Sequence, residues 1–208
     1  MSGQFSASTV RPFQPGIDVS HFQGDIDWTR VKAAGVQFAF IKATDGLTGI
    51  DPKLSANMTG AANAGIPFGL YHFYRPGTSR DGERQAFHFL SSVLPRPKLP
   101  SVLDLELAPI ILSDVEDWLT AVAAATGVQP IVYGSPSFLT EHCKDWAGTG
   151  TYPLWVAEYT TRRAPSTGPW KNWDFWQFSN TGSVDGISGP VDLDWFNGDL
   201  DALQSLIS

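Results

Sequence analysis

The residues best suited to chemistry are carboxylic acids near the ends of short apolar segments. Asp18 lies in GIDVS, Asp104 and Glu106 lie in VLDLEL, and Asp192 and Asp194 lie in VDLDWF. If these segments are strands of a parallel barrel, their carboxyl-terminal ends meet at one face, where such barrels carry their catalytic groups. The sequence therefore predicts a cluster of acids at one mouth of a barrel.

The spacing of Asp104 and Glu106 is the most informative of these patterns. Side chains two positions apart on a strand share a face, so both acids and Val102 point one way, and the intervening leucines point toward covering helices. Burying acids on an apolar strand face costs free energy, so such acids are expected only where they have interaction partners or a function. Repulsion should raise the pKa of at least one, which suits a general acid beside an ionised partner, as in glycoside hydrolysis. A Mg²⁺ or Ca²⁺ site, a buried ion pair and a surface pair at the end of a loop are alternative explanations of the same residues.

Other chemical motifs are weak or missing. The histidines show no zinc-binding spacing, and His72 in YHFY is either a cleft residue or a buried, hydrogen-bonded core residue. The sequence contains no GxSxG, GxGxxG or Walker motif. The sole cysteine, Cys143, excludes an intrachain disulfide and a cysteine metal cage, and we expect it to be a small buried hydrophobe.

Composition limits the class of protein. The chain has 208 residues, 42% of them hydrophobic and 17% charged, which suits one packed domain. Its 14 basic and 21 acidic residues give a net charge of −7 without a basic stripe, so nucleic acid is not an expected partner. No apolar run approaches the roughly 20 residues that span a bilayer, and the N-terminus shows no standard secretory signal. With 8 Trp, 13 Phe and 5 Tyr, the chain has either a large aromatic core or a cleft that binds rings.

The acids need a scaffold, and apolar runs alternate with helical patterns along the chain. We expect strands at 16–19, 36–42, 66–73, 101–106, 130–134, 154–157, 175–178 and 191–193. We expect helices at 26–34, 52–64 and 81–94, a further one from about 112, and short ones after Pro136 and at 200–206. Asp25 or Asp27 should cap the first helix, and Ser113 with Glu116 forms a capping-box pattern.

Five strand–helix units followed by three strands predict a single-domain α/β protein with a closed, TIM-like barrel and an incomplete helical jacket. Residues 1–14 are interpreted as an N-terminal arm and residues 15–208 as the barrel. An open, doubly wound sheet is the alternative arrangement.

Several blocks also point to one family. The blocks are GIDVSHFQGDIDW, FAFIKATDG, GLYHFYRP, VLDLEL, VYGS, LWVAEY, FWQFS and VDLDWFNG, and they cover about residues 16–198. Together, and in this order, they resemble glycoside hydrolase family 25, the Chalaropsis-type lysozymes or muramidases. The resemblance implies a flattened (β/α)5(β)3 barrel that cleaves the β-1,4 bond between N-acetylmuramic acid and N-acetylglucosamine in peptidoglycan. It implies an endolysin-like monomer whose partner is peptidoglycan and which needs no cofactor or metal.

The resemblance also assigns roles to the acids. It makes Glu106 the general acid, and it makes Asp104 an assistant that stabilises the substrate's own N-acetyl group as that group attacks the anomeric carbon. It has Asp18 and Asp192 hold the surrounding network of charges and hydrogen bonds. Asp194 stands where the family often has Asn, and it adds a further negative charge.

Aromatic side chains at the expected strand ends are candidate platforms for sugar rings. They are Tyr71, Phe73, Tyr133, Trp155 and Tyr159, and Gln177 is a candidate polar contact. For each of them, a place in the core is the competing interpretation. Tyr71 and Phe73 share a strand face and His72 points the other way, so only one of these sets can face a cleft.

Two other functions fit the same acids: a barrel that binds glycan without cutting it, and a metal-dependent phosphodiesterase on a similar barrel. Intact Asp104 and Glu106 argue against the first, and insensitivity to a chelator would exclude the second. The chain shows none of the wall-binding repeats of many relatives. Without a visible signal, we expect release to the wall by another protein or by a non-standard route, and the sequence assigns no compartment.

Overall fold

The computed structural model describes residues 13–77, 80–93 and 97–207. Its strands are β1 (Gln14–Val19), β2 (Phe38–Asp45), β3 (Gly49–Ile50), β4 (Phe68–Phe73), β5 (Val102–Asp104), β6 (Ile131–Gly134), β7 (Leu154–Ala157), β8 (Phe175–Gly182) and β9 (Val191–Phe196). Its helices are α1 (Trp28–Ala33), α2 (Leu54–Asn63), α3 (Asp81–Ser92), α4 (Leu112–Thr126), α5 (Pro136–Cys143) and α6 (Leu200–Ser205), with 3-10 turns η1 (His21–Gln23) and η2 (Ala147–Gly150). Of the expected N-terminal arm, residues 1–12 lie outside the described residues, and Gln14 already belongs to β1.

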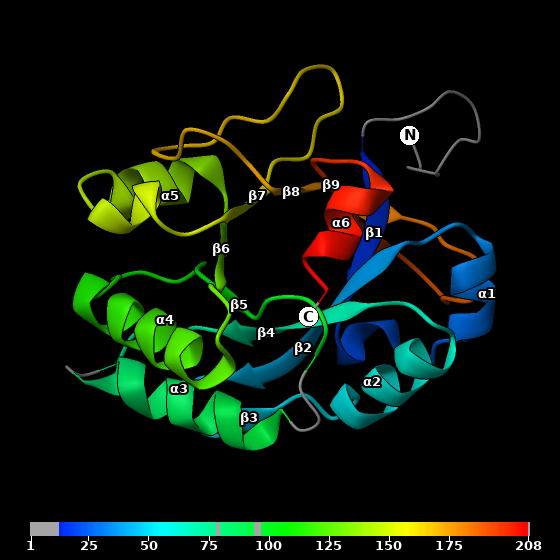
Figure 1. The fold of residues 1–208 in the computed structure, drawn as a ribbon, viewed down its shortest axis with the longest axis horizontal. Coiled ribbons are helices and arrows are strands. Elements are labelled where there is room, and N and C mark those ends of the chain that lie inside the picture. Colours follow the sequence, from blue (N-terminus) through cyan, green and yellow to red (C-terminus); the bar gives the residue numbers. More distant parts are fainter. Residues whose placement is uncertain (1–12, 78–79, 94–96, 208) are drawn as a thin grey trace.

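The strands form a closed barrel of the expected (β/α)5(β)3 type. They follow the order β1-β9-β8-β7-β6-β5-β4-β2, and β1 pairs with β2 as well as with β9, which closes the ring. The short β3 pairs with β2 outside this ring. Closure excludes the open, doubly wound sheet. Figure 1 shows α1 to α5 around the outside of the strands.

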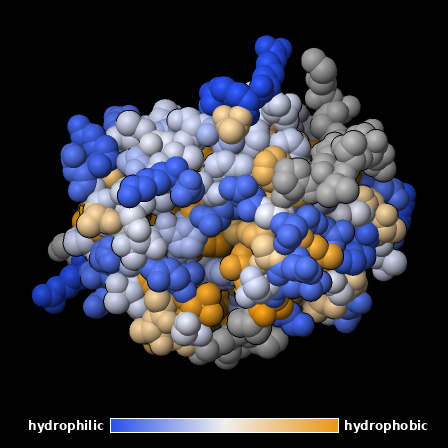
Figure 2. Space-filling view, turned by 45° about the horizontal axis from the view of Figure 1, so that its top comes forward, coloured by the Kyte–Doolittle hydropathy of each residue, from blue (hydrophilic) through white to orange (hydrophobic). Residues whose placement is uncertain are grey.

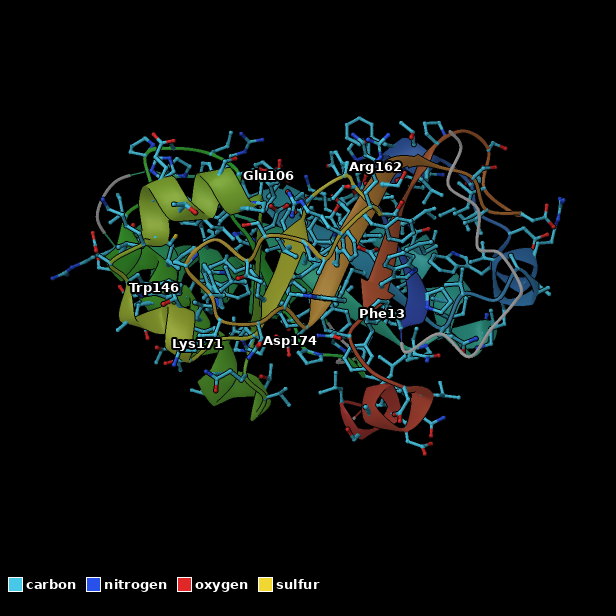
Figure 3. The ribbon with its side chains drawn as sticks, turned by 90° about the horizontal axis from the view of Figure 1, so that it is seen from above. Phe13, Glu106, Trp146, Arg162, Lys171 and Asp174 are labelled. Carbon is cyan, nitrogen blue, oxygen red and sulfur yellow. The ribbon has the colours of Figure 1, made fainter. Side chains whose placement is uncertain are left out.

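Strand alternation divides the apolar residues between two cores. An inner core fills the barrel with rings such as Phe38, Phe40 and Phe175, and Leu203 of α6 packs against it. An outer core lies between the strands and the helices and includes Leu103. Figure 3 shows α6 beyond one end of the strands. The barrel is therefore filled at that end.

Two glycines on the inner face make room for the inner rings. A Cβ at Gly16 would lie 2.2 Å from the ring of Phe38, and a Cβ at Gly69 would lie 2.7 Å from the ring of Phe40. Both separations are far below van der Waals contact, so the rings occupy space that any other residue at these positions would claim. Glycine is required here by close approach of the neighbouring strand's side chain.

Side-chain caps mark the beginnings of α1, α5 and α6. Oδ1 of Asp27 accepts hydrogen bonds from the backbone N–H groups of Thr29 and Arg30, both at 3.1 Å, so Asp27 is the cap and α1 begins two residues later than expected. The helix expected at 81–94 ends at Ser92, and Leu94 lies outside the described residues.

The expected capping box of Ser113 and Glu116 is wrong. Helix α4 has Ile111 at its N-cap position and no side-chain cap. Glu116 instead accepts hydrogen bonds from Nε1 of Trp146 at 3.0 Å and from the hydroxyl of Tyr152 at 2.8 Å. Two tertiary partners therefore replace the local backbone contact that the pattern suggests.

Candidate active site

The inner face of the barrel changes from apolar to polar along its strands. On β2, Phe38 and Phe40 belong to the inner core, and Lys42, two positions further, lines a cleft. On β5, Val102 is followed in the same way by Asp104. Because residues two apart share a strand face, each strand places a polar group directly above the inner rings.

The polar end of the barrel holds a cleft of about 340 Å³. Every side chain that the sequence singles out as catalytic or substrate-binding lines it: Asp18, Tyr71, Phe73, Asp104, Glu106, Tyr133, Trp155, Tyr159, Gln177 and Asp192. In Figure 3, Glu106 lies toward one end of the strands, and Phe13 and Asp174 lie toward the other. The fold thus brings together side chains that are spread from β1 to β9.

Asp104 and Glu106 form a hydrogen-bonded carboxyl pair in this cleft. Asp104 ends β5 and is 4% exposed, whereas Glu106 follows the strand and is exposed. The hydrogen bond between their side chains requires a proton on one of them. Burial raises the pKa of both acids, and the charge of Glu106 raises the pKa of Asp104 further. The hydrogen bond between them also raises the pKa of Asp104 and lowers that of Glu106, so in the free protein the shared proton favours Asp104. The pair therefore retains a proton at a pH where isolated carboxyls have lost it.

Lys42 supplies positive charge to the cleft from β2. Its side chain is 15% exposed, and its Nζ lies 3.2 Å from Oδ2 of Asp45 and 4.6 Å from the centre of the Phe73 ring. The ammonium charge favours the ionised forms of Asp104 and Glu106, and it thereby opposes the rise in their pKa values. Lys42 thus limits how strongly the pair holds its proton.

Asp18, Asp192 and Asp194 form a second cluster of acids. Pairing of β1 with β9 sets Asp18 opposite Asp192, and Gly16 opposite Asp194. The side chain of Asp18 is hydrogen-bonded to both of the other carboxyls. Burial and then repulsion by its two neighbours raise the pKa of Asp18, and burial raises the pKa of Asp192 to about 6. This cluster also retains protons that exposed aspartates would release.

The direction of β9 corrects one expectation. The sequence predicts Asp192 near the carboxyl-terminal end of a parallel strand, but β9 runs antiparallel to both β1 and β8, and Asp192 is its second residue. The amino-terminal end of β9 therefore meets the carboxyl-terminal end of β1 at the cleft. Asp194 lies deeper, is fully buried, and accepts a hydrogen bond at Oδ1 from Nε1 of Trp155 at 2.8 Å.

Gln177 on β8 connects the second acid cluster to two phenols. Its Nε2 donates a hydrogen bond to Oδ2 of Asp18 at 2.7 Å. Its Oε1 accepts from the hydroxyls of Tyr133 at 2.9 Å and Tyr159 at 3.1 Å. The side chain is 3% exposed and its polar atoms are engaged by protein groups, so the geometry describes a residue that orients Asp18.

The candidate sugar platforms differ in how much of each ring reaches solvent. Tyr159 is 56% exposed, and Tyr71 and Phe73 are half-buried. Tyr133 and Trp155 are 6% and 2% exposed, and Trp155 stacks on the inner ring of Phe40 with ring centres 4.5 Å apart. The first three offer ring surface to a ligand, whereas the last two form the floor of the cleft.

His72 is a core residue, as one of the two sequence-based interpretations has it. It is fully buried on the outer side of β4, with Nδ1 2.7 Å from Oγ1 of Thr44 and Nε2 2.9 Å from Oε1 of Gln85. Burial lowers the pKa of His72 to about 4. Cys143 is likewise buried, and burial raises the pKa of its thiol to about 11.

The cleft also contains residues that the sequence analysis did not single out: Val19, Ser20, Phe22, Gln23, Lys42 and Asn180. Lys42 had a usable signal, since it shares the strand face of Phe38 and Phe40. The residues that follow β1 had none, because the path of a turn does not follow from strand alternation.

The side chains of the cleft do not form a recognisable metal cage. Among the described residues, no group of three or more His, Cys, Asp or Glu side chains is arranged to hold a metal ion. No helix among the described residues is long and apolar enough to cross a membrane.

Comparisons with known proteins agree with this architecture. The chain is 38% identical over 207 residues to lysozyme M1 of Streptomyces globisporus, and this alignment covers 92% of this chain and 70% of that protein. The crystal structure of a bacterial lysozyme from Streptomyces coelicolor matches it with a TM-score of 0.83 and 38% identity, over 93% of this chain and 96% of that one. The muramidase of Acremonium alcalophilum matches it with a TM-score of 0.79 and 29% identity, over 93% and 98%. Residues 17–187 match the model of glycosyl hydrolases family 25, and the chain therefore belongs to that family.

Proposed function

We propose that this glycoside hydrolase is a muramidase, which cleaves the β-1,4 bond between N-acetylmuramic acid and N-acetylglucosamine in peptidoglycan. The observation that carries the proposal is the hydrogen-bonded pair of Asp104 and Glu106 in a cleft bordered by aromatic rings. Relatives with the same architecture are named lysozyme and muramidase, which supports the choice of substrate.

Glu106 acts as the general acid. It is the exposed member of the pair, so a glycosidic oxygen in the cleft can reach it, and its raised pKa keeps it protonated closer to neutral pH. It gives its proton to the leaving oxygen as the bond to the anomeric carbon breaks. It then takes a proton from the water that completes hydrolysis.

Asp104 assists the substrate's own acetamido group. Two carboxyls in hydrogen-bond contact are closer than the roughly 5 Å typical of an acid and a carboxylate nucleophile, and leave no room for an attacking water between them. This contact supports attack by the acetamido oxygen of the muramic acid residue on its own anomeric carbon. When substrate binds, the proton shared by the pair moves to Glu106, and Asp104 in its ionised form then accepts the N–H of that group and stabilises the positive charge that develops on it.

The second acid cluster positions the substrate and the first pair. Asp18 and Asp192 line the same cleft and hold protons in hydrogen bonds with each other. Gln177 fixes Asp18, and the exposed faces of Tyr71, Phe73 and Tyr159 pack against sugar rings. The enzyme works as a monomer and needs no metal or other cofactor.

Digestion of purified peptidoglycan tests the proposal. Products are analysed by mass spectrometry with and without borohydride reduction, in the presence of EDTA. We expect soluble fragments that end in reducible N-acetylmuramic acid, at an undiminished rate with the chelator. Fragments that end in reducible N-acetylglucosamine, or activity lost to EDTA, would contradict it. A folded protein that sediments with the wall but releases nothing would be a binding barrel instead.

A further inference from the structure

Phe22 is an exposed aromatic residue at the edge of the cleft. It belongs to η1, directly after β1, and 82% of its surface is exposed. It nevertheless lines the same cleft as Asp104 and Glu106. The face of the molecule drawn in Figure 2 carries mostly hydrophilic residues. Isolated exposed rings are common, so exposure alone assigns no role to Phe22.

The turn that carries Phe22 is fixed by its own hydrogen bonds. Oγ of Ser20 accepts from the backbone N–H of Phe22 at 3.3 Å, and Oε1 of Gln23 accepts from the backbone N–H of Ser20 at 2.9 Å. Nε2 of Gln23 also donates to the carbonyl of Pro190, which precedes β9. The ring is thus presented from a closed capping box that is tied to the neighbouring strand.

His21 and Asp51 hold the same turn from the other side. The buried carboxylate of Asp51 accepts from the backbone N–H of His21 at 3.0 Å and lies 2.8 Å from Nδ1 of its ring. The ring of His21 in turn packs on the ring of Phe22, with centres 4.2 Å apart. A ring that already packs on a neighbouring ring loses less conformational entropy when a ligand packs on it.

The position of Glu106 gives the cleft a direction. Glu106, Tyr133 and Tyr159 also line a second cavity of about 160 Å³, together with Ser135 and Phe138, which do not line the first. If Glu106 protonates the oxygen between two sugars, the muramic acid residue attended by Asp104 lies in the larger cavity. The leaving sugar then lies toward the smaller one. Phe22 borders only the larger cavity, on the side of the glycan that precedes the cleaved bond.

We propose that Phe22, held by the Ser20–Gln23 turn and the His21–Asp51 pair, forms a further sugar subsite. Its ring stacks on the N-acetylglucosamine residue that precedes the reacting muramic acid residue. This inference rests on the proposed function. It makes the enzyme prefer substrates that extend beyond the muramic acid on this side.

Two glycans without peptides test the subsite. One is the tetrasaccharide GlcNAc–MurNAc–GlcNAc–MurNAc, and the other is the trisaccharide left when its non-reducing GlcNAc is removed. For wild type, kcat/KM should be higher on the tetrasaccharide. In Phe22→Ala, the ratio of the two kcat/KM values should fall by roughly three- to tenfold, through KM on the tetrasaccharide. Phe22→Trp should restore the ratio, because it keeps an aromatic face.

Phe87→Ala is the matched control, since Phe87 is a 75% exposed ring on α3 that does not line the cleft. It should leave the ratio at its wild-type value. His21→Ala, which removes the ring behind Phe22, should lower the ratio less than Phe22→Ala does. An unchanged ratio in Phe22→Ala, or an equal loss on both glycans, would overturn the subsite.

Binding separates this inference from the proposed function. Calorimetry with Glu106→Gln, alone and combined with Phe22→Ala, measures the affinity for the tetrasaccharide without turnover. A weaker affinity in the double variant supports the subsite even if the wild type releases no product, which would refute the proposed reaction alone. Equal affinities would refute the subsite even if the wild type is an active muramidase.

Discussion

Gln177 and Asp18 are joined by a 2.7 Å hydrogen bond although they lie 159 positions apart in the chain. The bond runs from β8 to β1 across β9, which lies between them in the sheet. It therefore spans the strand that carries Asp192 and Asp194. It also holds the pKa of Asp18 below the value that burial and its acidic neighbours would otherwise set.

Replacing Gln177 should therefore disturb both stability and activity. Gln177→Met keeps the length of the side chain but removes the donor to Asp18 and the acceptor of two phenols. We expect the free energy of unfolding to fall by about 1–3 kcal/mol, and kcat to fall as Asp18 loses its orientation. Denaturant titration and peptidoglycan turnover measure the two effects. Gln204→Met, at an exposed position on α6, is the control, and an equal loss there would contradict the assignment.

Glu106→Gln should abolish turnover without unfolding the protein. The amide has the same shape and sits at an exposed position, but it has no proton to give. We expect kcat to fall on the order of 10²–10⁴-fold or more, with an unchanged thermal midpoint. Glu141→Gln on α5 should keep wild-type activity. Near-wild-type turnover by the Glu106 variant would remove the general acid from the mechanism.

Asp104→Asn should be nearly as damaging, for a different reason. The neutral amide cannot balance the positive charge that develops on the sugar ring and the acetamido group. We expect a large loss in kcat with little change in KM, since the charge appears only in the transition state. Asp174→Asn, toward the opposite end of the strands, is the matched control (Figure 3). A loss confined to KM would make Asp104 a residue for substrate binding alone.

Lys42 should set the pH range of activity. The wild-type enzyme should work best at acidic to neutral pH and lose activity as rising pH deprotonates Glu106. Lys42 stabilises the ionised carboxyls, so Lys42→Met raises their pKa values and should move the alkaline limb of the kcat/KM profile to higher pH. Lys42→Arg keeps the charge and should leave the limb in place. A shift of the Met variant to lower pH would show that the cation acts in another way.

Asp194 should make the protein less stable as pH rises. Burial raises the pKa of Asp194 in the folded protein above its value in the unfolded chain. At a pH between these two pKa values, the folded state therefore holds a proton that the unfolded state has lost. The resulting stabilisation is complete below the unfolded pKa and is lost as pH rises through the folded one. Asp194→Asn keeps the acceptor for Trp155 and should add about 1 kcal/mol or more at pH 8, and less at pH 5.

Denaturant titrations at the two pH values measure this difference. Asp201→Asn, at an exposed position on α6, is the control and should be neutral at both. If Asp194→Asn instead destabilised the protein more at pH 8 than at pH 5, the carboxylate would be a favourable charge in the folded state.

Much of the site was predictable from strand alternation. The spacing of Val102, Asp104 and Glu106 predicts that two acids and an apolar residue share a face, and the structure places Val102 in the inner core below the acids. The same rule applied to 36–42 would have found Lys42. Alternation has no direction, however, and so it predicted β9 as a strand while leaving its antiparallel course undetected.

Turns and tertiary hydrogen bonds are the parts that the sequence did not predict. The exposure of Phe22 depends on where the chain turns after β1. This path is fixed by a hydrogen bond to Asp51, which lies in the connection between β3 and α2. The pattern of Ser113 and Glu116 failed because Trp146 and Tyr152, distant in sequence, reach Glu116 in the folded state. In both cases the residue that determines the local structure is distant in sequence, so a pattern of neighbouring residues cannot predict it.

Gly69 shows how a position without any functional group can govern the alignment of the acids. A side chain there would press on Phe40, which stacks on Trp155, whose indole N–H holds Asp194. The closely packed rings of Phe40 and Trp155 thus connect Gly69 to Asp194. A displacement of Phe40 would therefore shift Trp155 and, through it, Asp194. A misplacement of about 1 Å is enough to slow catalysis strongly, so the absence of a side chain at Gly69 helps to keep the acids in their working positions.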